Sequence, residues 1–122
     1  MASLDMGTLK QLLEKLTIGE PTIRGVAIVS PDGLILVSSI TERDENDRLA
    51  AMTSEMLTAG NMTVRELNAG PLYMNMVFGT EGGVIVRGID EEMVLAALIN
   101  RSANVGRVVG LINQTVSALR AS

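Results

Sequence analysis

Apolar residues recur at helical spacing in three segments of the chain. The first segment contains Leu9, Leu12, Leu13 and Leu16 and predicts an amphipathic helix that ends before Gly19. The second follows the acidic stretch 41–47, whose carboxylates favour a helix start or form a solvated loop, and runs from Leu49 to about Leu67. The third extends to Leu119 after a predicted Ser102 cap.

The third helix also contains Gly106 and Gly110, four residues apart. A glycine in a helix interior costs about 1 kcal/mol relative to alanine. We therefore expect both glycines to compensate by packing closely against a sheet.

Runs of β-branched and aliphatic residues between these helices predict five strands, at 23–30, 34–40, 71–78, 84–89 and 93–99. Pro31-Asp32-Gly33 joins the first two as a hairpin, and short turns at 80–83 and 90–92 join the last three. Short turns make the sheet mainly antiparallel. Because most strands are apolar on consecutive residues, helices must cover both faces. The order α-β-β-α-β-β-β-α therefore predicts a three-layer α/β (α+β) sandwich.

The strand at 71–78 differs from the others because apolar and polar positions alternate along it. Leu72, Met74, Met76 and Phe78 are expected on one face, and Tyr73, Asn75 and Val77 on the other. It carries no charge, and its only proline is at its start, so nothing prevents this edge from pairing with another strand. We therefore predict dimerisation through it.

The second helix presents an apolar face that is wider than one core requires. Its members are Leu49, Ala50, Met52, Met56, Leu57 and Ala59. The excess suggests a second buried contact. The predicted dimer interface consists of Leu49, Met52, Met56, Tyr73, Met74, Asn75 and Met76.

The composition is that of one globular domain, which we expect to span residues 1–122. Hydrophobic residues make up 47% of the chain and charged residues 20%, which argues against disorder. The eight methionines can be core residues or adaptable contact residues. The net charge of −4, without a basic stripe, disfavours nucleic acid as a partner. No apolar run approaches the length of a membrane span, and the N-terminus lacks a signal-peptide pattern, so we expect a cytoplasmic protein without membrane insertion.

Residues with catalytic chemistry are scarce. The chain has no histidine and no cysteine, which excludes triads and thiolate metal sites built on them. No phosphate-binding glycine loop is present, and the acids at 42–47 lack the spacing of a calcium loop. A hydrolase that uses only carboxylates stays open, but no pair is nominated. We predict no catalytic, cofactor-binding or metal-binding residues, and hence a non-enzymatic binding module.

Three segments together resemble the roadblock/LC7 family, in particular its prokaryotic MglB-like members. They are Arg24 to Leu34 (RGVAIVSPDGL), the small-residue run 49–54 and Asn104-Val105-Gly106. The resemblance implies an antiparallel sheet of order 2-1-5-4-3 between one helix and two. It also implies homodimers in which the third strands pair and the second helices pack together.

Members of this family bind Ras-like small GTPases as activators or scaffolds, or serve as dynein light chains. We therefore expect a homodimeric regulator or scaffold of a Ras-like GTPase, with Arg48, Glu55 and Thr58 on the outward side of the second helix as partner-binding residues. That helix could instead serve dimerisation only. A dynein-light-chain-like adaptor, a general scaffold and a small-molecule sensor are the alternatives. The strands offer few polar residues for a sensor's ligand pocket.

Overall fold

The computed structural model describes residues 5–121. Its elements follow the predicted order. They are α1 (Met6–Gly19), β1 (Ile23–Val29), β2 (Ile35–Ser38), α2 (Arg43–Glu66), β3 (Met74–Gly79), β4 (Gly82–Gly88), β5 (Val94–Asn100) and α3 (Val105–Arg120).

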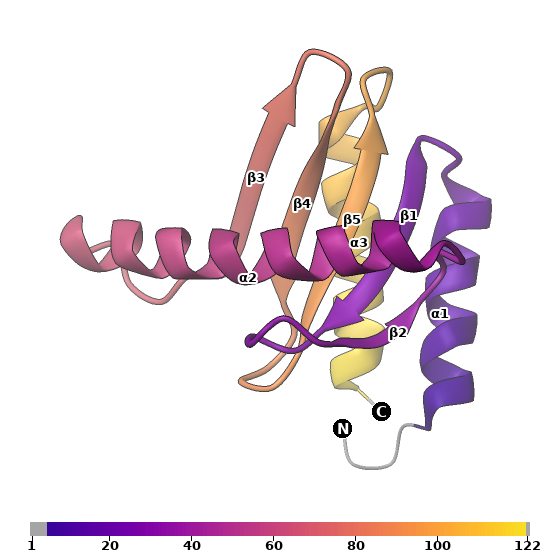
Figure 1. Ribbon diagram of the computed structural model, residues 1–122, viewed down its shortest axis with the longest axis horizontal. Helices are drawn as coiled ribbons and strands as arrows, with labels where there is room; N and C mark the ends of the chain where they lie inside the picture. The colour runs from indigo at the N-terminus through magenta and orange to yellow at the C-terminus, as the bar shows by residue number, and fades with distance from the viewer. Residues whose placement is uncertain (1–4, 122) are drawn as a thin grey trace.

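The five strands form one antiparallel sheet of order β2-β1-β5-β4-β3. Figure 1 shows α2 across one face of the sheet, with α1 and α3 on the other face. The predicted three-layer sandwich and the strand order implied by the family resemblance are therefore confirmed. The long central strands β1 and β5 are buried on both faces, whereas β2 and β3 form the two edges.

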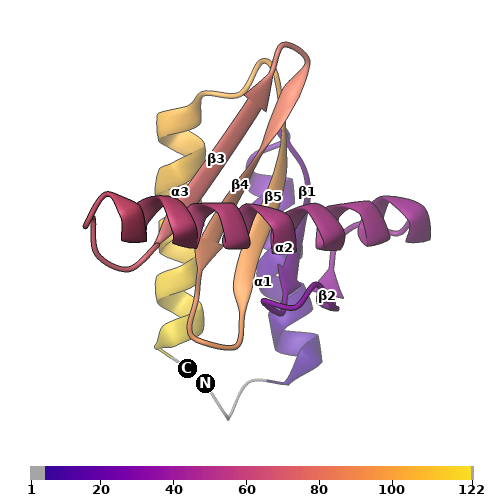
Figure 2. The same ribbon diagram turned by 60° about the vertical axis from the view of Figure 1, so that its left-hand side comes forward.

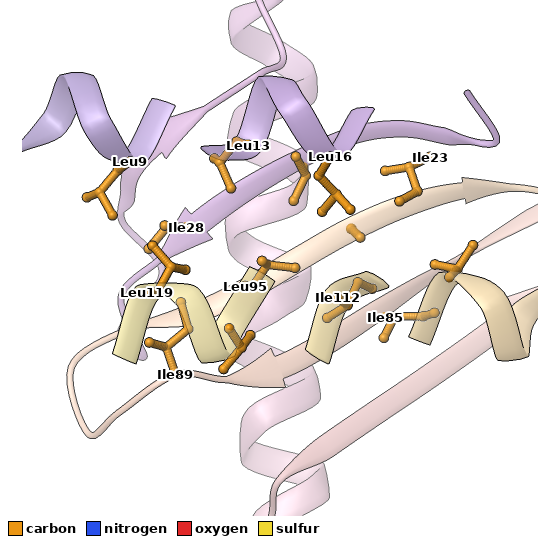
Figure 3. Packing of buried hydrophobic residues seen from close by; sticks show 14 of the residues in the cluster. Leu9, Leu13, Leu16, Ile23, Ile28, Ile85, Ile89, Leu95, Ile112 and Leu119 are labelled. Atoms are coloured by element: carbon orange, nitrogen blue, oxygen red, sulfur yellow. The ribbon is translucent and has the colours of Figure 1, made fainter. Parts of the chain in front are cut away.

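Two apolar layers hold the sandwich together. Large aliphatic side chains fill the layer between the sheet and the helices α1 and α3, among them Leu13, Ile85, Leu95 and Ile112, all fully buried (Figure 3). The layer under α2 contains smaller sheet residues, for example Ala96. Small residues let the long helix lie close to the sheet.

The start of α3 differs from the prediction. Its cap is Asn104, whose Oδ1 accepts a hydrogen bond from the Arg107 amide at 3.1 Å, and not Ser102. A capping side chain must reach an amide two or three residues further on, and Asn104 stands at that distance from the first turn. The expected packing of Gly106 and Gly110 on the sheet is also wrong. Both are exposed, and a Cβ on Gly110 would have no neighbour within 4 Å.

The β3–β4 hairpin is longer at its tip and shorter at its base than the prediction. Gly82 and Gly83 belong to β4, so only Thr80 and Glu81 form the turn. Residues 71–73 lie outside β3. The alternation of faces therefore fails at Leu72, whose side chain lies beside Gly60 of α2 instead of sharing the face of Met74.

Candidate functional site

The edge strand β3 is the most exposed apolar part of the sheet. Within the described chain its only neighbouring strand is β4, and it contains no charged residue. Met76, Val77 and Phe78 keep 43%, 53% and 48% of their surface exposed. An exposed, uncharged edge strand is a template for pairing with another strand.

The direction of the free backbone groups follows from the register of the hairpin. The Gly88 amide donates to the Tyr73 carbonyl at 3.1 Å, so alternate residues of β3 from position 73 onwards bond to β4. Asn75 and Val77 therefore point their N–H and C=O groups inwards. Met74, Met76 and Phe78 point theirs away from the sheet, towards the open edge.

Helix α2 is longer than the sheet beneath it is wide. Its 24 residues extend about 36 Å at 1.5 Å per residue, whereas five strands spaced about 4.8 Å apart cover about 20 Å. Figures 1 and 2 both show its C-terminal end extending beyond β3. Met62 and Leu67, in and directly after this end, are 57% and 71% exposed.

Two close contacts fix the place where α2 passes over β3. The Asn75 side chain donates from Nδ2 to the Met56 carbonyl at 2.8 Å. A Cβ added at Gly60 would lie 2.7 Å from Asn75 Nδ2 and 2.8 Å from a Leu72 methyl carbon. Only glycine therefore lets the helix approach the strand this closely at position 60.

A row of apolar residues beside α2 is only partly covered. The helix covers the row in which Asn75, Val86 and Ala96 are register partners. The next row on the same face contains Val77, Val84 and Leu98. Val84 and Leu98 of this second row line a groove of about 390 Å³, together with Arg24, Glu45, Arg48, Leu49 and Met52. Arg24 and Glu45 form an ion pair across it at 3.4 Å.

The predicted interface residues lie on α2 and in or beside β3, but on two faces of the sheet, since Asn75 bonds to α2 whereas Met74 packs in the layer of α1 and α3. Met52, Met56, Met74, Asn75 and Met76 all keep exposed or half-buried surface at this edge. Leu49 is only 5% exposed and belongs to the core of the subunit itself. Tyr73 turns away from α2, and its ring lies 4.9 Å from the Arg87 guanidinium carbon.

The three predicted partner-binding residues, Arg48, Glu55 and Thr58, are exposed on α2. None of them forms an ion pair within the described residues, and the Thr58 hydroxyl donates to the Ser54 carbonyl of its own helix.

Sequence reasoning missed several residues of this surface, namely Arg24, Met62, Leu67, Val77 and Phe78. The signal for Met62 and Leu67 was their position in a helix too long for its sheet, which becomes visible only when the width of the sheet is known.

Residues 5–121 contain no helix long and apolar enough to cross a membrane, and no group of three acids is placed to hold a metal ion.

Comparison with known proteins identifies the family. The model of the Roadblock/LC7 domain matches residues 9–99. The chain belongs to the Roadblock/LC7 family. Two uncharacterized proteins of Methanocaldococcus jannaschii are each 27% identical to this Roadblock/LC7 chain over 86 residues, which is 70% of the chain and 75% of either relative.

Solved structures share the fold of this Roadblock/LC7 chain. Myxococcus xanthus MglB superimposes with a TM-score of 0.85 at 15% identity, covering 97% of this chain and 96% of that one. An MglB described as having a tetrameric arrangement superimposes with a TM-score of 0.84 at 17% identity, covering 95% and 88%. At these identities the likeness shows the fold alone.

Proposed function

We propose that this protein is a non-enzymatic, cytoplasmic homodimer that binds a Ras-like small GTPase and regulates or scaffolds it. One observation carries the proposal. An uncharged edge strand with outward-pointing backbone groups lies beside a helix that extends past that edge. Both features are complementary to a second copy of the chain.

The backbone geometry supports pairing of β3 with β3. Antiparallel pairing about Met76 matches the outward groups of Met74 with those of Phe78 in the second copy, and those of Met76 with each other. On the face towards α3, the side chains brought together are then Met74, Met76 and Phe78 from each chain, all apolar. The pairing places no like charges opposite each other, an arrangement that would destabilise it.

The same two-fold axis brings the two α2 helices side by side. Helix α2 passes over β3 near Asn75, so the axis at Met76 places the second helix on the other side of that residue. At about 3.4 Å per residue, an axis one residue from Asn75 separates the two helices by about 7 Å, close to the roughly 8–10 Å of packed helices. Met52, Met56, Ala59 and Thr63 lie at i, i+4, i+7 and i+11 and form the side that would meet the partner.

The overhanging end of the second α2 would then lie over the partly covered row of Val77, Val84 and Leu98. Its exposed apolar residues, Met62 and Leu67, would fill the 390 Å³ groove. Its Glu66 would bring a carboxylate towards Arg24, which lines that groove. The exposed apolar surface of each chain is thus matched by a groove in the other.

The GTPase is proposed to bind the outer surface of the paired helices, where Arg48, Glu55 and Thr58 are exposed. Membership of the Roadblock/LC7 family and the fold shared with MglB support a GTPase as partner. The switch segments of a Ras-like GTPase are ordered only while the γ-phosphate is present, so they are the natural contact for a regulator. A regulator can accelerate hydrolysis by orienting the GTPase's own groups, because phosphoryl transfer depends mainly on positioning and charge.

The test is a calorimetric titration of Ras-like GTPases from the source organism, loaded with GDP or with a GTP analogue, into the wild type and Arg48→Glu. We expect tighter binding of the GTP-analogue state and at least tenfold weaker binding by Arg48→Glu. Lys10→Glu is the matched control, because it makes the same charge change on an exposed residue of α1, on the opposite face. Equal binding of both nucleotide states would refute recognition of the switches. Equal loss in both variants would show a general charge effect and remove Arg48 from the site.

A further inference from the structure

Two arginines with fixed orientations lie together near the start of β3, on the side of the sheet away from α2. Arg87 of β4 donates from Nε to Asn113 Oδ1 at 3.0 Å and from Nη1 to the Gly88 carbonyl at 2.6 Å. Arg120, the last residue of α3, donates from Nε to the Ile89 carbonyl at 2.6 Å. These bonds hold both guanidinium groups in place.

Neither guanidinium has a carboxylate partner among residues 5–121, where the three ion pairs all involve other arginines. Arg87 is half-buried, and its pKa is lowered first by that burial and then by the positive charge of Arg120. A partly desolvated charge beside a like charge is unfavourable unless a counter-ion is supplied. Arg87 therefore carries a partly desolvated positive charge without a direct ion-pair partner among residues 5–121.

The two arginines line a hollow of about 240 Å³. Tyr73 forms another wall, with its ring 4.9 Å from the guanidinium carbon of Arg87. Asp90 and Glu91 line the hollow as well, but neither carboxylate is within 4.0 Å of a guanidinium nitrogen. The Asp90 carboxylate instead accepts the Glu92 amide at 2.8 Å.

We propose that this hollow is an oxyanion site in which Arg87 and Arg120 bind a phosphate or carboxylate group of a small ligand. The bonds described above use Nε and Nη1 of Arg87 and Nε of Arg120, and within residues 5–121 they leave Nη2 of Arg87 and both Nη atoms of Arg120 available. Two fixed guanidinium groups with free N–H donors match the geometry of an oxyanion. The site does not depend on the proposed GTPase surface, which lies on α2.

The protein contains a reporter for this site, since Tyr73 is its only tyrosine and it has no tryptophan. Tyrosine fluorescence should change saturably when inorganic phosphate or succinate is added at constant ionic strength. N-acetyl-tyrosinamide, titrated in parallel, corrects for direct quenching by the anion. Saturation by phosphate alone or by succinate alone assigns the ligand chemistry to that group.

Arg87→Gln and Arg120→Gln should each weaken the binding at least tenfold. Arg120 is exposed at the end of α3, so its variant tests the site even if Arg87→Gln fails to fold. Arg65→Gln is the matched control, because Arg65 is an exposed arginine of α2 without an ion pair among residues 5–121. No saturable change with either anion would overturn the proposal, as would equal affinity in the wild type and Arg120→Gln.

Discussion

The same substitution should change stability in opposite directions at two helical glycines. Gly60 of α2 and Gly110 of α3 both lie inside helices, so alanine gains about 1 kcal/mol of helix propensity at each. At Gly110 the new methyl group would have no neighbour within 4 Å, so this gain is not opposed. At Gly60 it would lie 2.7 Å from Asn75 Nδ2 and 2.8 Å from a Leu72 methyl carbon.

The cost at Gly60 can be estimated from what must move. Overpacking a tight site costs about 1–3 kcal/mol, and displacing the Asn75 amide also loses its hydrogen bond to the Met56 carbonyl, worth about 1 kcal/mol. After subtracting the propensity gain, Gly60→Ala should destabilise by about 1–3 kcal/mol. Gly110→Ala should stabilise by about 1 kcal/mol, which for a chain of this length raises Tm by roughly 3–6 °C.

Urea unfolding of the two variants at one protein concentration, followed by circular dichroism, measures both changes. A fixed concentration is needed because dimerisation makes apparent stability depend on it. The two variants should differ by at least about 2 kcal/mol, with opposite signs relative to the wild type. If Gly60→Ala were as stable as Gly110→Ala, the close approach of α2 to β3 would be refuted.

Three further predictions concern the core, one cap and one carboxylate. Ile112→Ala should destabilise by about 2–5 kcal/mol in urea unfolding, because Ile112 is fully buried between α3 and the sheet. Asn104→Ala should cost about 1 kcal/mol in the same assay whereas Ser102→Ala should be neutral; the reverse would restore Ser102 as the cap. Hydrogen bonds from Thr22 and then Arg107 lower the pKa of Glu20. The Glu20 carboxylate therefore contributes to folding stability above the ordinary glutamate pKa, and this contribution is lost as the pH falls through the lowered pKa. Urea midpoints measured across that acidic range should therefore fall less steeply in Glu20→Gln than in the wild type, and equal slopes would contradict this.

Much of the fold could be predicted because the strands and helices carry strong local patterns. The consecutive apolar residues of β1 and β5 indicate burial on both faces, and Pro31-Asp32-Gly33 indicates the hairpin between β1 and β2. The errors concern places where local patterns are ambiguous. Ser102 and Asn104 are both good caps, and only the actual first turn selects between them.

The candidate site was less predictable because exposure depends on tertiary packing. Leu49 and Met52 both belong to the apolar pattern of α2. Leu49 packs between the helix and the sheet, whereas Met52 is 51% exposed at the side of the helix. The predicted position of Tyr73 in the interface extends the alternation of β3 to residues 71–73, which lie outside the strand. The direction of each backbone amide also requires the register with β4, which the sequence does not specify.

The register provides the most direct test of the proposed dimer. The amide of Met76 points to the open edge, so Met76→Pro should remove a bond between subunits while breaking none within the chain. Proline at Asn75 would instead break the pairing of β3 with β4 in each subunit, and Met76→Leu is the conservative control.

Sedimentation equilibrium at micromolar concentration measures the mass of each variant in solution. The wild type and Met76→Leu should have twice the 12.9 kDa mass of one chain, and Met76→Pro should have the mass of one chain with an unchanged circular dichroism spectrum. A monomeric wild type would contradict the dimer itself, and a dimeric Met76→Pro would contradict its formation through β3.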